Sequence, residues 1–154
     1  MNTKLLWGAV GVLALAVIGA AAWKAWPLLN PKVVASAPLD PACDLNASPC
    51  TSVLPGGGSV TFAISPQPIR PMEPLTLAAT VEWRKVRALE ADFQGEGMNM
   101  GFNRSTLQDE GGRFHGGTML PVCVRDVMEW RARLLIRTDE GVIEAPFRFL
   151  VRSH

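Results

Sequence analysis

The sequence predicts an all-β domain that follows one N-terminal transmembrane helix and a proline-rich linker. Three observations support this prediction: an uncharged apolar run near the start, a stretch rich in Pro and Gly after it, and strand-like alternation of apolar and polar residues over the rest of the chain. These changes divide the 154 residues into an anchor at 1–23, a linker at 24–57 and a domain at 58–154.

The apolar run, residues 5–23, has no charged side chain. About 20 helical residues, rising about 1.5 Å each, cross a hydrocarbon core of about 30 Å. A cleaved secretory signal is the alternative, because Lys4 gives a positive start and the alanines at 20–22 are a small-residue cleavage signature. Either interpretation exports the rest of the chain. A retained anchor predicts a single-pass protein of the bacterial inner membrane whose domain faces the periplasm.

The linker, residues 24–57, contains recurrent prolines and leads into three glycines at 56–58. Because proline fixes φ and lacks an N–H donor, we expect a semi-extended spacer without regular structure. Cys43 and Cys50 lie in it with six residues between them. In an oxidising compartment they most simply form a local disulfide. Metal ligation, which favours closer spacing such as Cys-x-x-Cys, and pairing of either cysteine with Cys123 are the alternatives.

Beyond the linker, apolar residues alternate with period two in runs rich in β-branched and aromatic side chains. We expect strands at 60–64, 75–81, 86–93, 113–115, 119–124, 130–138 and 142–151. The last two, joined by Asp139-Glu140-Gly141, indicate a β-hairpin. About seven short strands at regular spacing favour an immunoglobulin-like β-sandwich. The side chains expected to fill its core are Phe62, Leu77, Val81, Trp83, Phe93, Phe114, Leu134, Ile136, Phe147 and Phe149.

Charge and composition exclude some function classes. The net charge is +1 and no basic stripe occurs, so a nucleic-acid partner is not expected. The chain has two histidines, His115 and the terminal His154, which leaves little from which to build a nucleophilic triad. Glu90 and Asp92 share one strand face, where solvated charge is the ordinary interpretation. We therefore expect a protein that is not an enzyme and has no catalytic residues.

One segment could bind a metal ion. Met98 and Met100 are two residues apart, so in an extended chain their thioethers emerge on the same face. Thioether sulfur is a soft ligand that, with thiolate or imidazole, selects Cu(I). Alternation places Met119 and Cys123 on one face of a following run, and His115 is a further candidate. The candidate copper ligands are Met98, Met100, Met119, Cys123 and His115.

Core packing is the competing interpretation of these residues. Methionine commonly fills gaps in apolar cores, and an unpaired cysteine is among the most buried residue types. Both methionines of the pair, and Cys123, could therefore be ordinary core residues. His115 follows Phe114, so if Phe114 lies in the core, His115 points outward as a solvated residue.

The order of the motifs resembles the FixH-like and YtkA-like periplasmic domains over about residues 60 to 151. The motifs are Gly-x-x-Met-x-Met-Gly at 95–101, Gly-Gly-x-Phe-x-Gly at 111–116, Met-Leu-Pro-Val-Cys at 119–123 and Met-Glu-Trp-Arg-Ala-Arg at 128–133. The resemblance implies copper handling or cytochrome oxidase assembly. The positions of this chain to which that implication applies are Met98, Met100, Arg113-Phe114, Met119 and Trp130. Two features depart from the pattern: the usual Met-x-Gly-x-Trp approach to the last hairpin is replaced by residues 123–130, and no histidine lies near the methionine pair.

Two functional hypotheses follow. The first is a membrane-anchored extracytoplasmic domain that binds Cu(I), or assists metal delivery to, or assembly of, a membrane complex such as a cytochrome oxidase. The second is a metal-free interaction module whose arginine-bearing last hairpin docks on an integral membrane partner.

Overall fold

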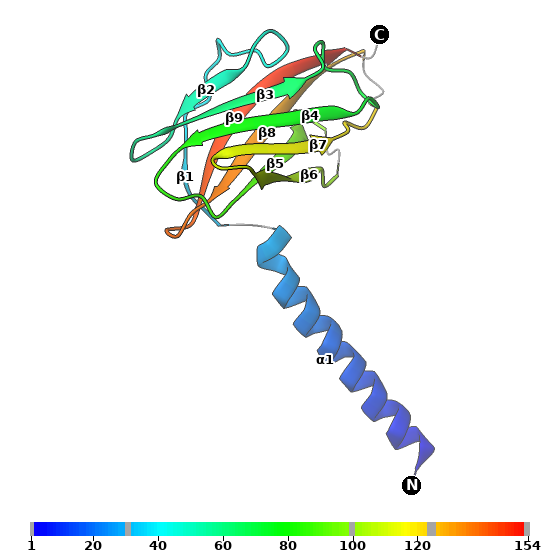
Figure 1. Ribbon diagram of the computed structural model, residues 1–154. Coiled ribbons are helices and arrows are strands. Elements are labelled where there is room, and N and C mark those ends of the chain that lie inside the picture. Colours follow the sequence, from blue (N-terminus) through cyan, green and yellow to red (C-terminus); the bar gives the residue numbers. More distant parts are fainter. Residues whose placement is uncertain (1, 30–31, 99–100, 123–125, 153–154) are drawn as a thin grey trace. The chain divides into compact units, whose positions relative to one another are not determined.

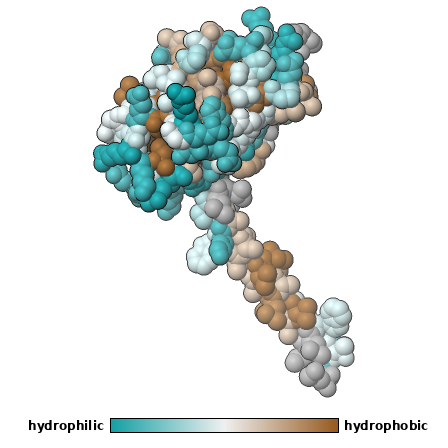
Figure 2. Space-filling model, viewed as in Figure 1, coloured by the Kyte–Doolittle hydropathy of each residue, from teal (hydrophilic) through white to brown (hydrophobic). Residues whose placement is uncertain are grey.

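The structure, a computed structural model, describes residues 2–29, 32–98, 101–122 and 126–152. The chain separates into two compact units, Met1–Lys32 and Val33–His154. The first unit consists of α1 (Thr3–Leu29), a helix with no distinct polar face, and Figure 2 shows apolar colour over its middle. Its stretch Trp7–Pro27 is long and apolar enough to cross a membrane, a property shared by transmembrane anchors and secretory signals. The apolar helix is therefore confirmed.

The second unit is all-β, as the sequence predicts (Figure 1). Its strands are β1 (Val33–Ser36), β2 (Cys50–Val53), β3 (Ser59–Ser65), β4 (Leu75–Glu82), β5 (Ala88–Gly95), β6 (Arg104–Asp109), β7 (Arg113–Thr118), β8 (Val127–Arg137) and β9 (Val142–Arg152). Within the described ranges these nine strands form one hydrogen-bonded sheet in the order β1-β9-β8-β5-β6-β7-β4-β3-β2. The sheet curls so that one half, from β1 to β5, faces the other, from β7 to β2 (Figure 1).

Strand β6 joins the two halves. It pairs with β5 at Leu89↔Leu107, and then with β7 at Gln108↔His115. A Cβ atom at Gly116 of β7 would lie 3.2 Å from the backbone oxygen of Thr106, so glycine permits the close approach of β6 and β7. The close contact between β6 and β7, through which the two halves are joined, therefore depends on a residue without a side chain.

Alternating side chains from both halves meet in a single core. Phe62 of β3 and Phe147 of β9 belong to opposite halves, and their ring centroids lie 5.6 Å apart. Of the ten side chains expected in the core, nine are buried, and Trp83 is partly buried against the cluster. The predicted hairpin is also confirmed, because β8 and β9 pair continuously from Val127↔Arg152 to Arg137↔Val142.

Most of the segment that was expected to be a spacer belongs instead to the folded unit. Within residues 24–57, β1 pairs in parallel with β9 and β2 pairs with β3, and Leu45 and Leu54 are 0% and 2% exposed. The folded unit therefore begins at Val33 rather than at residue 58. Pro38, Pro41 and Pro49 lie between β1 and β2, and Pro55 lies between β2 and β3, where no ladder hydrogen bond is needed from them, whereas Pro27 lies within α1.

The strand count and two strand positions also differ from expectation. The structure has nine strands in one curled sheet, whereas about seven in a sandwich were expected. Residues 119–122, the described part of the expected run 119–124, are not a strand. Strand β6 was missed because its sequence, Arg-Ser-Thr-Leu-Gln-Asp, has a single apolar residue, and alternation cannot be read from one position.

Candidate functional site

Three loops meet at one end of the sheet, which we call the loop end. It comprises the described residues 66–74, 96–98, 101–103 and 119–122, which connect β3 to β4, β5 to β6, and β7 toward β8 (Figure 1). The strand registers place these loops together, because Ser65 pairs with Thr76 and Leu75 with Thr118. Residues far apart in the sequence therefore become neighbours there.

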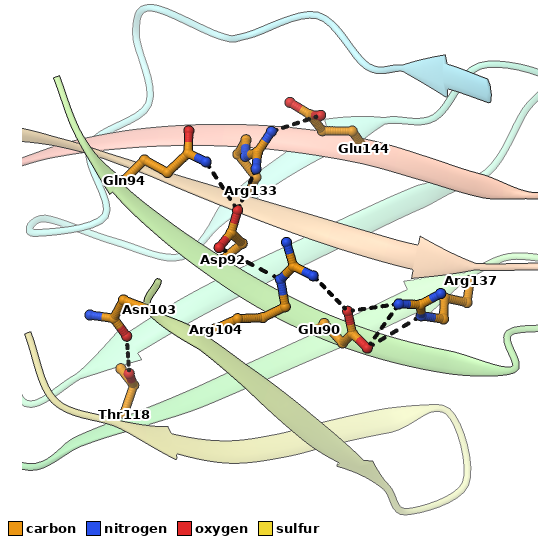
Figure 3. A network of polar contacts seen from close by, with 9 residues as sticks. All are labelled: Glu90, Asp92, Gln94, Asn103, Arg104, Thr118, Arg133, Arg137 and Glu144. Carbon is orange, nitrogen blue, oxygen red and sulfur yellow. Dashed lines mark hydrogen bonds and ion pairs between the residues drawn. The ribbon is translucent and has the colours of Figure 1, made fainter. Parts of the chain in front are cut away.

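Specific hydrogen bonds connect the three loops. The backbone N–H of Met72 donates to the carbonyl oxygen of Leu120 at 2.9 Å. The Asn103 side chain accepts a hydrogen bond from Thr118 Oγ1 at 3.4 Å (Figure 3). It also donates one to the carbonyl oxygen of Met119 at 3.5 Å. The Asn103 carbonyl also accepts from the N–H of Phe93 at 2.8 Å. Asn103 thus ties the loop after β5 to the segment after β7.

This arrangement brings two of the sequence-predicted ligands to the loop end. Met98 is partly buried and packs against the core cluster, and the Met119 side chain is 47% exposed. Met100 and Cys123 lie outside the described residues. Met72, which was not among the predicted ligands, is 60% exposed, and its N–H bonds to Leu120, the neighbour of Met119 in the sequence. The loop end therefore combines thioethers from three separate loops.

His115 lies apart from these methionines. It is exposed on β7, and its Nε2 lies 4.0 Å from Glu110 Oε2, while Phe114 is buried. The alternation of these two residues is as expected. Four residues of extended strand, at about 3.3 Å each, separate His115 from Met119 by about 13 Å. His115 is therefore too distant from Met119 to share an ion with it.

Exposed apolar side chains occur on the loop end and at the start of β8. We call the exposed residues Met72, Phe102, Met119, Val122 and Val127 the apolar rim; each is at least 47% exposed. The guanidinium of Arg104 lies 4.9 Å from the centroid of the Phe102 ring. Within the described ranges, no three His, Cys, Asp or Glu side chains converge in a metal-binding group. The chemistry that the rim presents is soft and apolar.

A charged network covers the outer face of β5, β6, β8 and β9 (Figure 3). Asp92, expected to be solvated, is 3% exposed and accepts a hydrogen bond from Arg133. Arg133 also pairs with Glu144 at 3.6 Å, and Arg104 lies 3.6 Å from Asp92 and 3.8 Å from Glu90. Arginine side chains thus enclose Glu90 and Asp92. The expectation that these two carboxylates are solvated was wrong.

The arginines of the last hairpin are largely engaged in ion pairs. Arg131 pairs with Glu96 at 2.5 Å, and Arg148 pairs with Glu129 at 3.5 Å. Arg133 and Arg137 belong to the charged network. The signal that could have revealed this network is that arginines recur on one face of β8 and acids on one face of β5, each with period two.

Cys43 and Cys50 form a disulfide with 5.8 Å between their Cα atoms. The loop that they close buries Leu45 completely, and Asn46 within it accepts a hydrogen bond from the N–H of Ile69 at 2.8 Å. Asn46 also donates to the carbonyl oxygen of Leu150. The disulfide therefore stabilises a loop that packs on the end of β9 and on the β3–β4 connection.

No family model matches the chain, and no curated protein matches its sequence. The interpretation of the loop end therefore rests on its own residues. Met72 carried no period-two signal, but it follows Pro71 and precedes Glu73-Pro74. A proline in the second position of a turn places the next residue at its third position, and this is the signal that could have drawn attention to Met72.

Proposed function

We propose that this chain is a membrane-anchored extracytoplasmic domain that binds Cu(I) at its loop end. Its role would be to assist delivery of the ion to a membrane complex such as a cytochrome oxidase, or assembly of that complex. The observation that carries the proposal is that the loops bearing Met98 and Met119 lie at the same end of the sheet and are joined through Asn103. Met100 and Cys123, neighbours of these residues in sequence, complete the proposed ligand set.

The chemistry of thioethers supports Cu(I) over harder cations. Methionine sulfur is neutral and soft, which favours a soft monovalent ion over Mg²⁺ or Ca²⁺. A thioether has no proton to lose, so ion binding by Met98 and Met119 releases none, in contrast to binding by thiols or imidazoles. Exposure of Met119 gives a partner access to the ion. Neutral thioether ligands in an accessible position suit transfer of the ion rather than its permanent retention.

The proposed location and fold class draw on separate features. The apolar helix α1 is suited to a bilayer, and a disulfide between Cys43 and Cys50 is typical of an oxidising compartment such as the periplasm. The seven strands β3 to β9, with halves that face each other over one core, support an immunoglobulin-like class to which β1 and β2 add edge strands. The FixH-like and YtkA-like resemblance agrees with this proposal.

A metal-free interaction module is the second candidate. The apolar rim favours it, because large apolar side chains exposed at one end of a domain are suited to protein–protein contacts. Such a module would dock through the loop end rather than through the last hairpin, since Arg131, Arg133, Arg137 and Arg148 are engaged by carboxylates.

An anaerobic Cu(I) titration of the full chain in detergent micelles, with a competing chromophoric chelator, tests the proposal. We expect wild-type affinity tighter than micromolar and loss of binding in the double variant Met98→Leu with Met100→Leu. Leucine conserves apolar volume, so stability should change by less than about 1.5 kcal/mol. Met128→Leu, which replaces a buried methionine of β8, is the matched control and should bind as wild type. Wild-type affinity weaker than micromolar would favour the interaction module.

A further inference from the structure

Met72 has an unusual backbone conformation. Among the residues that the structure describes, it alone combines a side chain with a positive φ, 60°. L-amino acids rarely adopt this left-handed region, because the Cβ atom crowds the backbone. Met72 follows Pro71 in a turn, at the position that glycine usually occupies when φ is positive. An unbranched apolar residue there needs an explanation.

Packing does not supply that explanation. The Met72 side chain is 60% exposed, so it contributes little to the core. Glycine would adopt the same φ without strain and would fit the turn better. Backbone strain of this kind is often retained where the side chain has a function. The side chain, rather than the turn, therefore accounts for methionine at this position.

The position of Met72 indicates what that function is. Its N–H donates to Leu120 at 2.9 Å, directly beside Met119. This hydrogen bond brings the backbones of Met72 and Leu120 together, and the Cα atom of Met119 is about 3.8 Å from that of Leu120. Met72 and Met119 are both exposed, and each side chain has three rotatable bonds, so their sulfurs can approach a common ion.

We propose that Met72 is a further thioether ligand of the copper site at the loop end. The site then draws one sulfur from each of three loops, through Met72, Met98 and Met119. This inference rests on the proposed function and extends it, because it assigns to the site a ligand from the β3–β4 loop.

Two substitutions distinguish a role of the Met72 sulfur from a role of this residue in the turn. Met72→Leu keeps the apolar volume and the strained backbone but removes the sulfur. Met72→Gly also removes the sulfur and relieves the strain, so its melting temperature should equal or exceed that of wild type. We expect both variants, as full chains in detergent micelles, to bind Cu(I) at least tenfold more weakly in chelator competition. Met128→Leu, which leaves the loop end intact, should keep wild-type affinity.

The outcomes distinguish this inference from the proposed function. If Met98→Leu weakens binding while Met72→Leu or Met72→Gly keeps wild-type affinity, Met72 is not a ligand and the copper function stands. A wild-type chain that binds no Cu(I) overturns both. If either Met72 variant fails to fold, the other still decides the question, because both lack the sulfur.

Discussion

Arg137 binds Glu90 side-on: its Nε donates to one carboxylate oxygen and its Nη2 to the other, each at 3.2 Å. A planar guanidinium matched to a carboxylate in this way gives a strong and directional contact. The two residues belong to neighbouring strands β8 and β5, and Asp92 and Arg133 continue the same ladder of charges. The outer face of this half of the sheet is therefore held by ion pairs, and the inner face by apolar contacts.

Removal of the buried carboxylate should strongly destabilise the domain. Asp92→Ala leaves Arg133, and the 9% exposed side chain of Arg104, without their shared acid. We expect a loss of about 3 to 5 kcal/mol in the free energy of unfolding, measured with urea. Glu73→Ala is the matched control, since it breaks an exposed pair with Arg70 and should cost less than about 1 kcal/mol. Similar small losses in both variants would show that the network contributes little.

Two adjacent glycines should respond differently to alanine. Gly57 and Gly58 have φ of 94° and 89°, so a Cβ atom strains the backbone equally at both. At Gly58 the Cβ would also overlap the backbone oxygen of Glu82 and the ring of Trp83, whereas at Gly57 nothing lies within 4 Å. Gly57→Ala should cost about 1 to 2 kcal/mol, and Gly58→Ala clearly more, as measured by thermal unfolding. Equal costs would refute the contact between the glycine turn and Trp83.

The disulfide should leave one free thiol. The chain has three cysteines, and Cys43 pairs with Cys50. Thiol counting under denaturing conditions should therefore find one reactive group, and peptide mapping should assign it to Cys123. The double variant Cys43→Ser with Cys50→Ser should lose about 2 to 3 kcal/mol of stability, because the short closed loop no longer restricts the unfolded chain. Three free thiols, or peptides that link Cys123, would contradict the pairing.

Asp139 should titrate below the ordinary range of aspartate. The hydrogen bond from Arg87 lowers the pKa of Asp139 from 3.8; desolvation opposes it, and the positive charges of Arg87 and Lys85 add smaller lowering effects. Because the folded-state pKa is the lower one, the contribution to stability is complete above the unfolded value and disappears as the pH falls through the folded value. In an NMR titration, Arg87→Gln should raise the pKa of Asp139 toward 3.8. An unchanged titration curve would exclude the pair in solution.

Alternation in the sequence predicted what most strands bury but, apart from the β8–β9 hairpin, not which strands pair. Phe62 and Phe147 were expected in the core because period two places them on inner faces, and both are buried. Strand β6 carries only Leu107 as a buried apolar residue, so no local pattern marked it. The contact of Met72 with Leu120 joins residues 48 positions apart, and local periodicity contains no information about such a pairing.

The linker was mispredicted for a different physical reason. Prolines were weighed as evidence against structure, but Leu45 and Leu54 contribute apolar surface that outweighs local propensity once the sheet is present. A fragment starting at residue 58 would lose both edge strands and the disulfide loop. Experiments on the loop end should therefore retain the chain from Val33 onward, and the full chain is preferable.

X-ray absorption spectroscopy at the copper edge reports directly which atoms hold a bound Cu(I) ion. The full chain, loaded anaerobically with one equivalent of Cu(I), should show a first shell of sulfur alone at about 2.3 Å. The sulfur shell should weaken when Met98 and Met119 are both replaced by leucine. A first shell made of nitrogen or oxygen, or copper that is lost on gel filtration of the wild-type chain, would contradict a thioether site at the loop end.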